Sequence, residues 1–99
     1  YSRASTPSEP EIEFQVRHMP GGRTSAFVAN ELEVGDTVKV SGPLGSSYLR
    51  DKHAGPVLLV AGGSGFAPMQ SILNTLMARD YREKVVLYVG VRSERDLYH

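Results

Sequence analysis

The sequence contains no cysteine, carries no net charge and has no long apolar run. Without cysteine, the 99 residues cannot hold a disulfide, a thiolate zinc site or an iron–sulfur cluster. Its 11 basic and 11 acidic residues balance, which gives no electrostatic reason to expect nucleic acid or an anionic membrane as a partner. No apolar stretch approaches the roughly 18–20 residues of a membrane span. We therefore expect a soluble, cytoplasmic polypeptide that binds neither nucleic acid nor a membrane.

The first half of the chain has the alternating pattern of half-buried strands. Apolar and polar residues alternate through EIEFQVRH (11–18) and through DTVKVSGP (36–43), as in a strand with one wet face. Between them, TSAFVANELEVGD (24–36) predicts a short helix that Thr24 or Ser25 caps and a glycine stops. Antiparallel strands with one short helix indicate part of a β-barrel or sandwich.

The second half has a different pattern. PVLLVAG (56–62) and KVVLYVGV (84–91) are continuous apolar runs, which are typical of parallel strands buried on both faces. A helix is predicted between them, with Pro68 in its first turn and an apolar face formed by Met69, Ile72, Leu73, Leu76 and Met77. The second half is therefore predicted to form a β-α-β unit, the beginning of an α/β parallel-sheet domain.

The change of pattern near KHAGP (52–56) predicts two domains, divided into residues 1–54 and residues 55–99. Neither half is complete, because a single β-α-β unit leaves its strand edges unpaired and its outer faces uncovered. We therefore expect the chain to be a fragment of a longer protein, with the C-terminal part of one domain followed by the N-terminal part of the next.

The turn GGSGFAP (62–68) lies where a buried strand leads into a helix. Free backbone N–H groups at a helix N-terminus attract anions, and glycine lets a pyrophosphate approach the backbone closely. Residues 63–68 follow the pattern G-x-G-x-x-P, a variant of the dinucleotide-binding fingerprint. The turn is therefore a candidate dinucleotide grip.

Two other interpretations of this turn stay open. A serine-hydrolase elbow, G-x-S-x-G, would need glycine where Phe66 stands, and His99 is the one histidine after Ser64. A tight corner without a ligand is the other alternative. His18, His53 and His99 show no metal-ligand spacing, so we expect no metal and interpret the last two as surface residues.

Several ordered motifs resemble the ferredoxin–NADP reductase-like flavoproteins, especially the reductase components of Rieske-type aromatic-ring oxygenases. The resemblance covers nearly the whole chain and implies an FAD-binding antiparallel β-barrel in residues 1–54 and an NAD(P)-binding α/β domain in residues 55–99. The motifs are YSRAS (1–5), PGGRTSAFV (20–28), SGPLGSSYLRDKHAGP (41–56), GGSGFAP (62–68) and LYVGVRSERDLY (87–98).

The resemblance also implies which residues would contact the flavin. Tyr1 and Ser2 match the last two residues of the family motif R-x-Y-S and would be the catalytic pair, Tyr1 on the isoalloxazine and Ser2 near flavin N5. Without the resemblance, Tyr1 and Ser2 would be interpreted as an ordinary exposed terminus. From sequence alone, Thr24 and Ser25 fit a plain helix cap about as well as a phosphate site, and Arg17 fits a solvated strand face nearly as well as a flavin contact. The implied FAD-binding set is Tyr1, Ser2, Val16, Arg17, His18, Gly22, Thr24 and Ser25, the last three around the pyrophosphate.

For the nicotinamide nucleotide, the resemblance implies Gly63, Ser64, Gly65 and Pro68. The family often carries threonine where Ser64 stands, and serine keeps the hydroxyl. After the second strand, Arg92 would admit a ribose 2′-phosphate, whereas Asp96 would repel it. We expect NADH as the cofactor with some tolerance of NADPH, although a mixed-charge run of this kind is also typical of a solvated face.

The function implied is a flavin-dependent NAD(P)H oxidoreductase that passes electrons from NAD(P)H through FAD to an iron–sulfur acceptor. The partner would be a ferredoxin or a Rieske-type iron–sulfur oxygenase component, and a [2Fe–2S] centre would lie elsewhere in the longer protein. We expect this segment to be inactive by itself. The alternative is a non-catalytic nucleotide-binding sensor module, which would need no flavin site.

Overall fold

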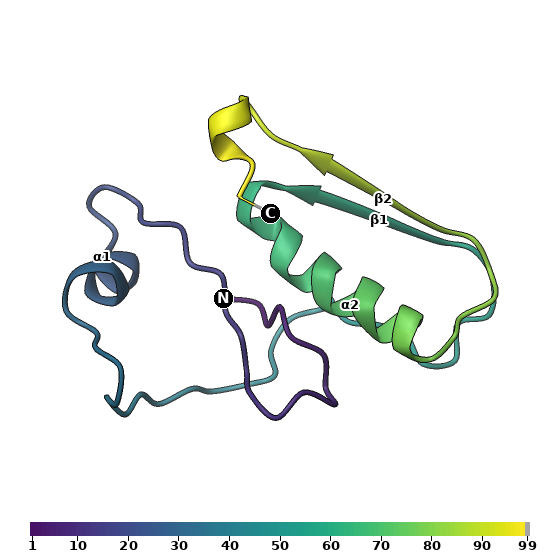
Figure 1. The fold of residues 1–99 in the computed structure, drawn as a ribbon, viewed down its shortest axis with the longest axis horizontal. Helices are drawn as coiled ribbons and strands as arrows, with labels where there is room; N and C mark the ends of the chain where they lie inside the picture. Colours follow the sequence, from purple (N-terminus) through teal and green to yellow (C-terminus); the bar gives the residue numbers. More distant parts are fainter. Residues whose placement is uncertain (99) are drawn as a thin grey trace. The chain divides into compact units, whose positions relative to one another are not determined.

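The computed structural model describes residues 1–98. The prediction for His99 lies outside the described residues. Two units are distinguished: the first unit contains Tyr1–Gln15 and the chain from Tyr48 onward, and the second unit is Val16–Ser47. The elements in chain order are α1 (Arg23–Asn30), β1 (Val57–Gly62), a 3₁₀ turn (Gly63–Gly65), α2 (Phe66–Ala78), β2 (Val85–Gly90) and a second 3₁₀ turn (Glu94–Asp96) (Figure 1).

In the first unit, β1 and β2 form a parallel pair that α2 connects. The register runs from Val57 opposite Val85 to Gly62 opposite Gly90, and α2 contacts both strands (Figure 1). Parallel strands need a crossover of this kind, since a tight hairpin can join only antiparallel neighbours. The predicted β-α-β unit is therefore confirmed, with Pro68 in the first turn of α2 as expected.

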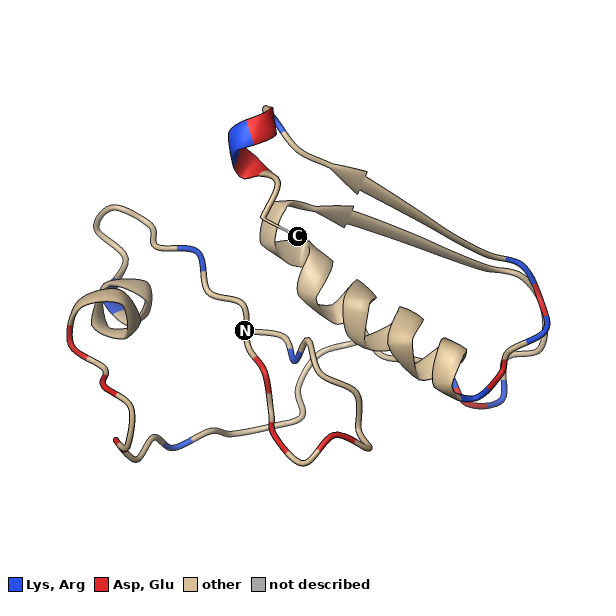
Figure 2. Cartoon of the chain, in the orientation of Figure 1, with Lys and Arg blue, Asp and Glu red and all other residues tan. Residues whose placement is uncertain are grey.

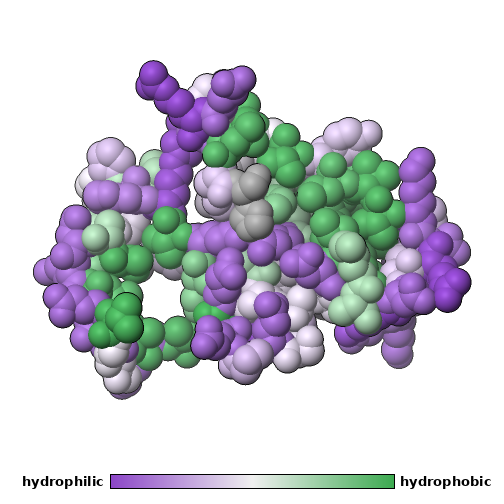
Figure 3. Space-filling view, viewed as in Figure 1, coloured by the Kyte–Doolittle hydropathy of each residue, from purple (hydrophilic) through white to green (hydrophobic). Residues whose placement is uncertain are grey.

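The sheet is buried on one face only, so the prediction of strands buried on both faces is wrong for this segment. Leu59 and Ala61 are buried, whereas Leu58 and Val60 remain 65% and 64% exposed. Side chains alternate across a strand, and no element within residues 1–98 covers the second face. Figure 3 shows hydrophobic surface over the helix and strands of this unit.

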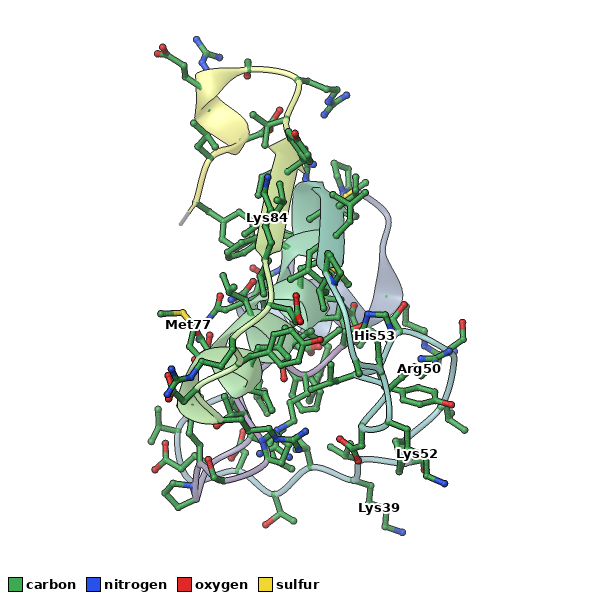
Figure 4. All side chains as sticks on the ribbon, turned by 90° about the vertical axis from the view of Figure 1, so that its right-hand side faces the viewer. Lys39, Arg50, Lys52, His53, Met77 and Lys84 are labelled. Carbon is green, nitrogen blue, oxygen red and sulfur yellow. The ribbon has the colours of Figure 1, made fainter. Side chains whose placement is uncertain are left out.

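The buried side of α2 also differs from the predicted apolar face. Met77 is 70% exposed and projects away from the helix (Figure 4), whereas Thr75 and Leu76 are buried. Thr75 can be buried because its hydroxyl donates to the carbonyl of Ser71 at 2.7 Å, which leaves no unsatisfied polar group. Apolarity at helical spacing therefore predicted the helix but not the orientation of its last turn.

The end of α2 is tied to the segment that enters β1. Asp80 adopts a left-handed conformation (φ 53°) that ends the helix, and the N–H of Tyr81 donates back to the carbonyl of Leu76. The Tyr81 hydroxyl then donates to the carbonyl of Gly55 at 2.5 Å and accepts the N–H of the same residue at 3.0 Å. A nearby ion pair joins Arg79 to Asp51 at 2.8 Å.

The alternating segments of the first half form little strand. Residues 11–18, which span the boundary between the two units, contribute one antiparallel bridge, in the first unit between Arg3 and Phe14, beside the Ala4 N–H to Glu13 carbonyl bond of 2.8 Å. Residues 36–43, in the second unit, contain no strand. A strand is stable only when another segment pairs with it, and no further partner is present within residues 1–98. The prediction of two extended strands in residues 11–18 and 36–43 is therefore wrong. The described residues 1–98 show no antiparallel barrel.

Helix α1, in the second unit, begins and ends earlier than predicted. Its cap is Gly22, not Thr24 or Ser25, because the Ser25 hydroxyl lies inside the helix and accepts the N–H of Met19 at 3.1 Å. The helix ends at Asn30, where the N–H groups of the next two residues both donate to the carbonyl of Phe27. The expected stop, Gly35, lies beyond the helix in a turn with φ 99°.

No helix described in residues 1–98 has both the length and the apolar character needed to cross a membrane.

We predict that Tyr81→Phe lowers the free energy of unfolding by about 1–2 kcal/mol, because it removes both hydrogen bonds to Gly55 and keeps the ring. Chemical denaturation measures the change. Tyr88→Phe is the matched control, since the Tyr88 side chain is exposed on the sheet. Equal stability of the two variants would contradict a structural role for the Tyr81 hydroxyl.

Candidate functional site

The pairing register brings the carboxyl ends of β1 and β2 to one edge of the sheet, and both strands end in glycine. Gly62 lies opposite Gly90, and the turn Gly63–Gly65 leaves this edge to enter α2. In open parallel sheets, ligands bind beyond the carboxyl ends of the strands. The candidate nucleotide site therefore lies at the edge where the sequence places its glycine turn.

The backbone of this turn is open to a ligand. Apart from its chain neighbours, no described residue would lie within 4 Å of a Cβ atom placed on Gly62, Gly63 or Gly65. Gly63 has φ 53°, a conformation that glycine adopts without strain. The turn therefore has the room that a close pyrophosphate contact needs.

The electrostatics of α2 also suit an anion. Its first turn contains no acidic residue, and no side chain caps its N-terminus. Figure 2 shows that the helix is uncharged along its length, while charged residues gather in the loop after it and around Glu94–Asp96. No acidic residue of the helix's own first turn neutralises the positive end of the helix dipole, and the residues of this turn fit a bound phosphate group.

The segment after β2 brings two of the predicted nucleotide residues into contact. The Arg92 Nε atom lies 3.8 Å from the Asp96 Oδ2 atom, and the Arg92 side chain is 82% exposed against 20% for Asp96. Arg92 therefore extends into solvent while Asp96 is turned inward. Both residues follow β2 from the edge that carries the glycine turn.

The serine-hydrolase alternative gains no support from the geometry. Ser64 is exposed, and within residues 1–98 its hydroxyl makes no hydrogen bond to a histidine. A nucleophilic serine needs an adjacent base that takes its proton.

No group of three His, Asp or Glu side chains among the described residues is arranged to hold a metal ion.

In the second unit, the start of α1 gathers three predicted FAD residues. A Cβ atom on Gly22 would lie 2.6 Å from the Ser25 Oγ atom, so the turn requires glycine. Ser25 is buried and its oxygen accepts the Met19 N–H, which gives this hydroxyl a role in building the turn. Thr24 is exposed, and the first N–H groups of α1 have no partner within the helix. An anion at this end would therefore meet Thr24 and backbone N–H groups.

The other predicted flavin residues are divided between the units. Tyr1 is 69% exposed, and Ser2 is exposed beside it in the first unit. Val16 is partly buried in the second unit, where Arg17 and His18 are exposed. Tyr1 and Ser2 therefore lie in the first unit, and the other predicted FAD residues lie in the second unit.

Sequence reasoning missed one group of side chains in the first unit. The Tyr98 hydroxyl donates to the Gln15 amide oxygen at 2.7 Å, and the Gln15 amide nitrogen donates to the Gln70 amide oxygen at 2.8 Å. The Tyr98 ring meets Phe66 edge to face, with ring centres 6.2 Å apart. The only local signal is the spacing of Phe66 and Gln70, which places both on one face of α2.

Comparison with known proteins identifies two classes of domain. Residues 1–48 match the oxidoreductase FAD-binding domain, and residues 59–99 match the oxidoreductase NAD-binding domain. The chain carries a segment of each, in the order that the resemblance implied, and these domains bind FAD and a nicotinamide nucleotide.

Its relatives are reductase components of oxygenase systems. The chain is 51% identical over 98 residues to the ferredoxin–NAD(P)⁺ reductase component of the naphthalene 1,2-dioxygenase/salicylate 5-hydroxylase systems of a Ralstonia species, covering 99% of this chain and 30% of that protein. It is 46% identical to the corresponding component of the Pseudomonas putida naphthalene 1,2-dioxygenase system, with the same coverage. The crystal structure of the Amycolatopsis cytochrome P450 reductase GcoB matches with a TM-score of 0.86 and 42% identity, over 99% of this chain and 31% of that one. The chain thus spans about three-tenths of the length of these relatives, and the predicted resemblance is confirmed.

We predict that Gly63→Ala destabilises the protein by about 1 kcal/mol and that Gly65→Ala does not. Both sites have room for a methyl group, but only Gly63 has a left-handed backbone, in which a side chain is strained. Denaturant unfolding of the two variants isolates backbone strain from crowding. A larger loss for Gly65→Ala would contradict this geometry.

Proposed function

We propose that this chain is part of a flavin-dependent reductase that takes electrons from NADH and passes them through FAD to an iron–sulfur acceptor. The observation that carries the proposal is the open glycine turn at the carboxyl ends of two parallel strands, in a chain whose earlier residues match an FAD-binding domain. When bound, the flavin supplies the chemistry of accepting a hydride and releasing its electrons singly. The protein supplies binding, orientation and electrostatics.

In this proposal, the nucleotide pyrophosphate lies over the glycine turn. The N–H groups of the turn Gly63–Gly65, which leads into α2, hold it, and Ser64 adds a hydroxyl. Pro68 favours the helical conformation in the first turn and needs no N–H partner there. Arg92 and Asp96 lie where the segment after β2 can meet the ribose, as in other dinucleotide folds.

We propose that residues 1–54 belong to the antiparallel FAD barrel and residues 55–99 to the nucleotide domain. The antiparallel Arg3–Phe14 bridge supports the first part, and the parallel β1–β2 pair supports the second. Gly22, Thr24 and Ser25 form the turn at the FAD pyrophosphate, with Thr24 and backbone N–H groups as donors. The remaining FAD-binding residues are Tyr1 and Ser2, proposed as the catalytic pair, with Val16, Arg17 and His18 along the flavin edge.

The acceptor is proposed from the names of the relatives. Two of them are ferredoxin–NAD(P)⁺ reductase components of dioxygenase systems, and another is the reductase component of a Pseudomonas phenol 2-monooxygenase. A ferredoxin or a Rieske-type oxygenase component is therefore the proposed partner, with any [2Fe–2S] centre of the reductase outside this cysteine-free chain.

The test uses the longer protein that contains this segment. We expect it to purify with a visible flavin absorption band that NADH bleaches under anaerobic conditions. Gly65→Val should raise the KM for NADH about tenfold or more while FAD remains bound, because the side chain fills the space proposed for the pyrophosphate.

Ala78→Val, at the exposed far end of α2, is the matched control and should leave the KM unchanged. A colourless protein that still binds NADH would be a nucleotide sensor and would contradict the proposed reductase. An unaltered KM in Gly65→Val would show that the turn is only a structural corner.

We predict that Arg92→Ala lowers kcat/KM for NADPH more than for NADH, by about tenfold, because it removes a charge-assisted contact with the 2′-phosphate. The exposed position of Arg92 leaves its guanidinium accessible to a ligand. Steady-state kinetics with both nucleotides measure the difference. Equal losses would mean that Arg92 does not read the 2′ position, and a wild-type preference for NADPH would contradict the choice of NADH.

A further inference from the structure

A hydrogen-bonded group of side chains lies beside the first turn of α2. It links Tyr98, which follows the second 3₁₀ turn, through Gln15 of the N-terminal segment to Gln70 of the helix. The two hydrogen bonds measure 2.7 and 2.8 Å, both of good length for their types. Three segments far apart in the sequence therefore meet at a single amide, that of Gln15.

The direction of these hydrogen bonds follows from Glu13. Its carboxylate oxygen lies 3.3 Å from the Gln15 amide nitrogen, and an ionised carboxylate can only accept a hydrogen bond. The Gln15 amide nitrogen must therefore face Glu13 and Gln70, and the Gln15 amide oxygen must face Tyr98. The Tyr98 hydroxyl is then the donor.

A protonated Tyr98 is the form that can donate this bond. Burial raises the pKa of Tyr98 above its usual value, so its hydroxyl keeps its proton throughout the neutral range. The ring of the same residue packs edge to face on Phe66, at an interplanar angle of 84°.

Both ends of this group fall on the part of α2 that follows the glycine turn. Phe66 is the first residue of the helix and comes directly after Gly65, and Gln70 lies one turn further along the same face. The next residue, Ser71, donates its hydroxyl to the carbonyl of Ser5 at 2.7 Å. The N-terminal segment is thus attached to this flank of the helix at two places.

We propose that Gln15 and Tyr98 are positioning residues for nucleotide binding, which hold the first turn of α2 in register with the N-terminal segment. This inference rests on the proposed function. Gln15 directly precedes Val16, where the proposed flavin edge begins, and its amide is bonded to the helix that begins directly after the glycine turn proposed for the pyrophosphate. A small displacement of preorganised donors is felt strongly in binding, whereas one part-buried and one exposed hydrogen bond add little to overall stability.

The test uses the longer flavin-loaded protein with Gln15→Met, Tyr98→Phe and the double variant. Methionine keeps the length of glutamine, and phenylalanine keeps the ring contact with Phe66, so each change removes hydrogen bonding alone. We expect each single variant to raise the Kd for NAD⁺ on the order of tenfold, measured by calorimetry, with an unchanged flavin absorption spectrum. The double variant should be no weaker than the weaker single, because both residues act through one chain of bonds.

Tyr81→Phe is the control, since it loses hydrogen bonds at the other end of α2 and should lower the melting temperature without changing the Kd. If the Gln15 and Tyr98 variants behave like Tyr81→Phe, their role is structural and the proposal is overturned. Additive effects in the double variant would also overturn it. Wild-type protein that fails to bind NAD⁺ or NADH would overturn the proposed function and this inference together, and would be recognised before any substitution is made.

Discussion

The parallel pairing of β1 with β2 is the constraint on which the candidate site depends. Because the strands run in the same direction, the chain between them must cross the sheet, and α2 makes that crossing. The register places Gly62 opposite Gly90, so the start of α2 and the segment that carries Arg92 leave the sheet at the same edge. A shift of one residue would move Leu59 and Ala61 from the covered face to the open one.

The crossover helix is attached at both ends by tyrosine hydroxyls, with different consequences. At its far end, Tyr81 holds the Gly55 peptide and so fixes the entry into β1. At its near end, Tyr98 joins the helix to the N-terminal segment through Gln15. The first attachment lies at the amino end of the sheet and supports the fold. The second lies beside the glycine turn, where an ordered backbone matters for holding an anion.

Local sequence patterns succeeded where the chain supplies its own partners and failed where partners are distant. The β-α-β unit was predictable because its strands pair with each other and its helix covers them. The strand expected in EIEFQVRH (11–18) is reduced to a single bridge at Phe14, since alternation describes a face but provides no neighbour. The cap of α1 was predicted at the wrong residue, because the Ser25 hydroxyl accepts the Met19 N–H from the turn before the helix.

The sequence by itself determined the identity of the elements in the second half, the position of the glycine turn and the family resemblance, because each is written in neighbouring residues. Only the tertiary structure decided that Met77 faces solvent, that Arg92 forms an ion pair with Asp96, and that the Ser25 hydroxyl accepts a hydrogen bond from Met19. It alone joined Tyr98 to Gln15, two residues separated by most of the chain. Periodicity records which face of an element is apolar, but a hydrogen bond between distant polar side chains depends on where the backbone brings them together.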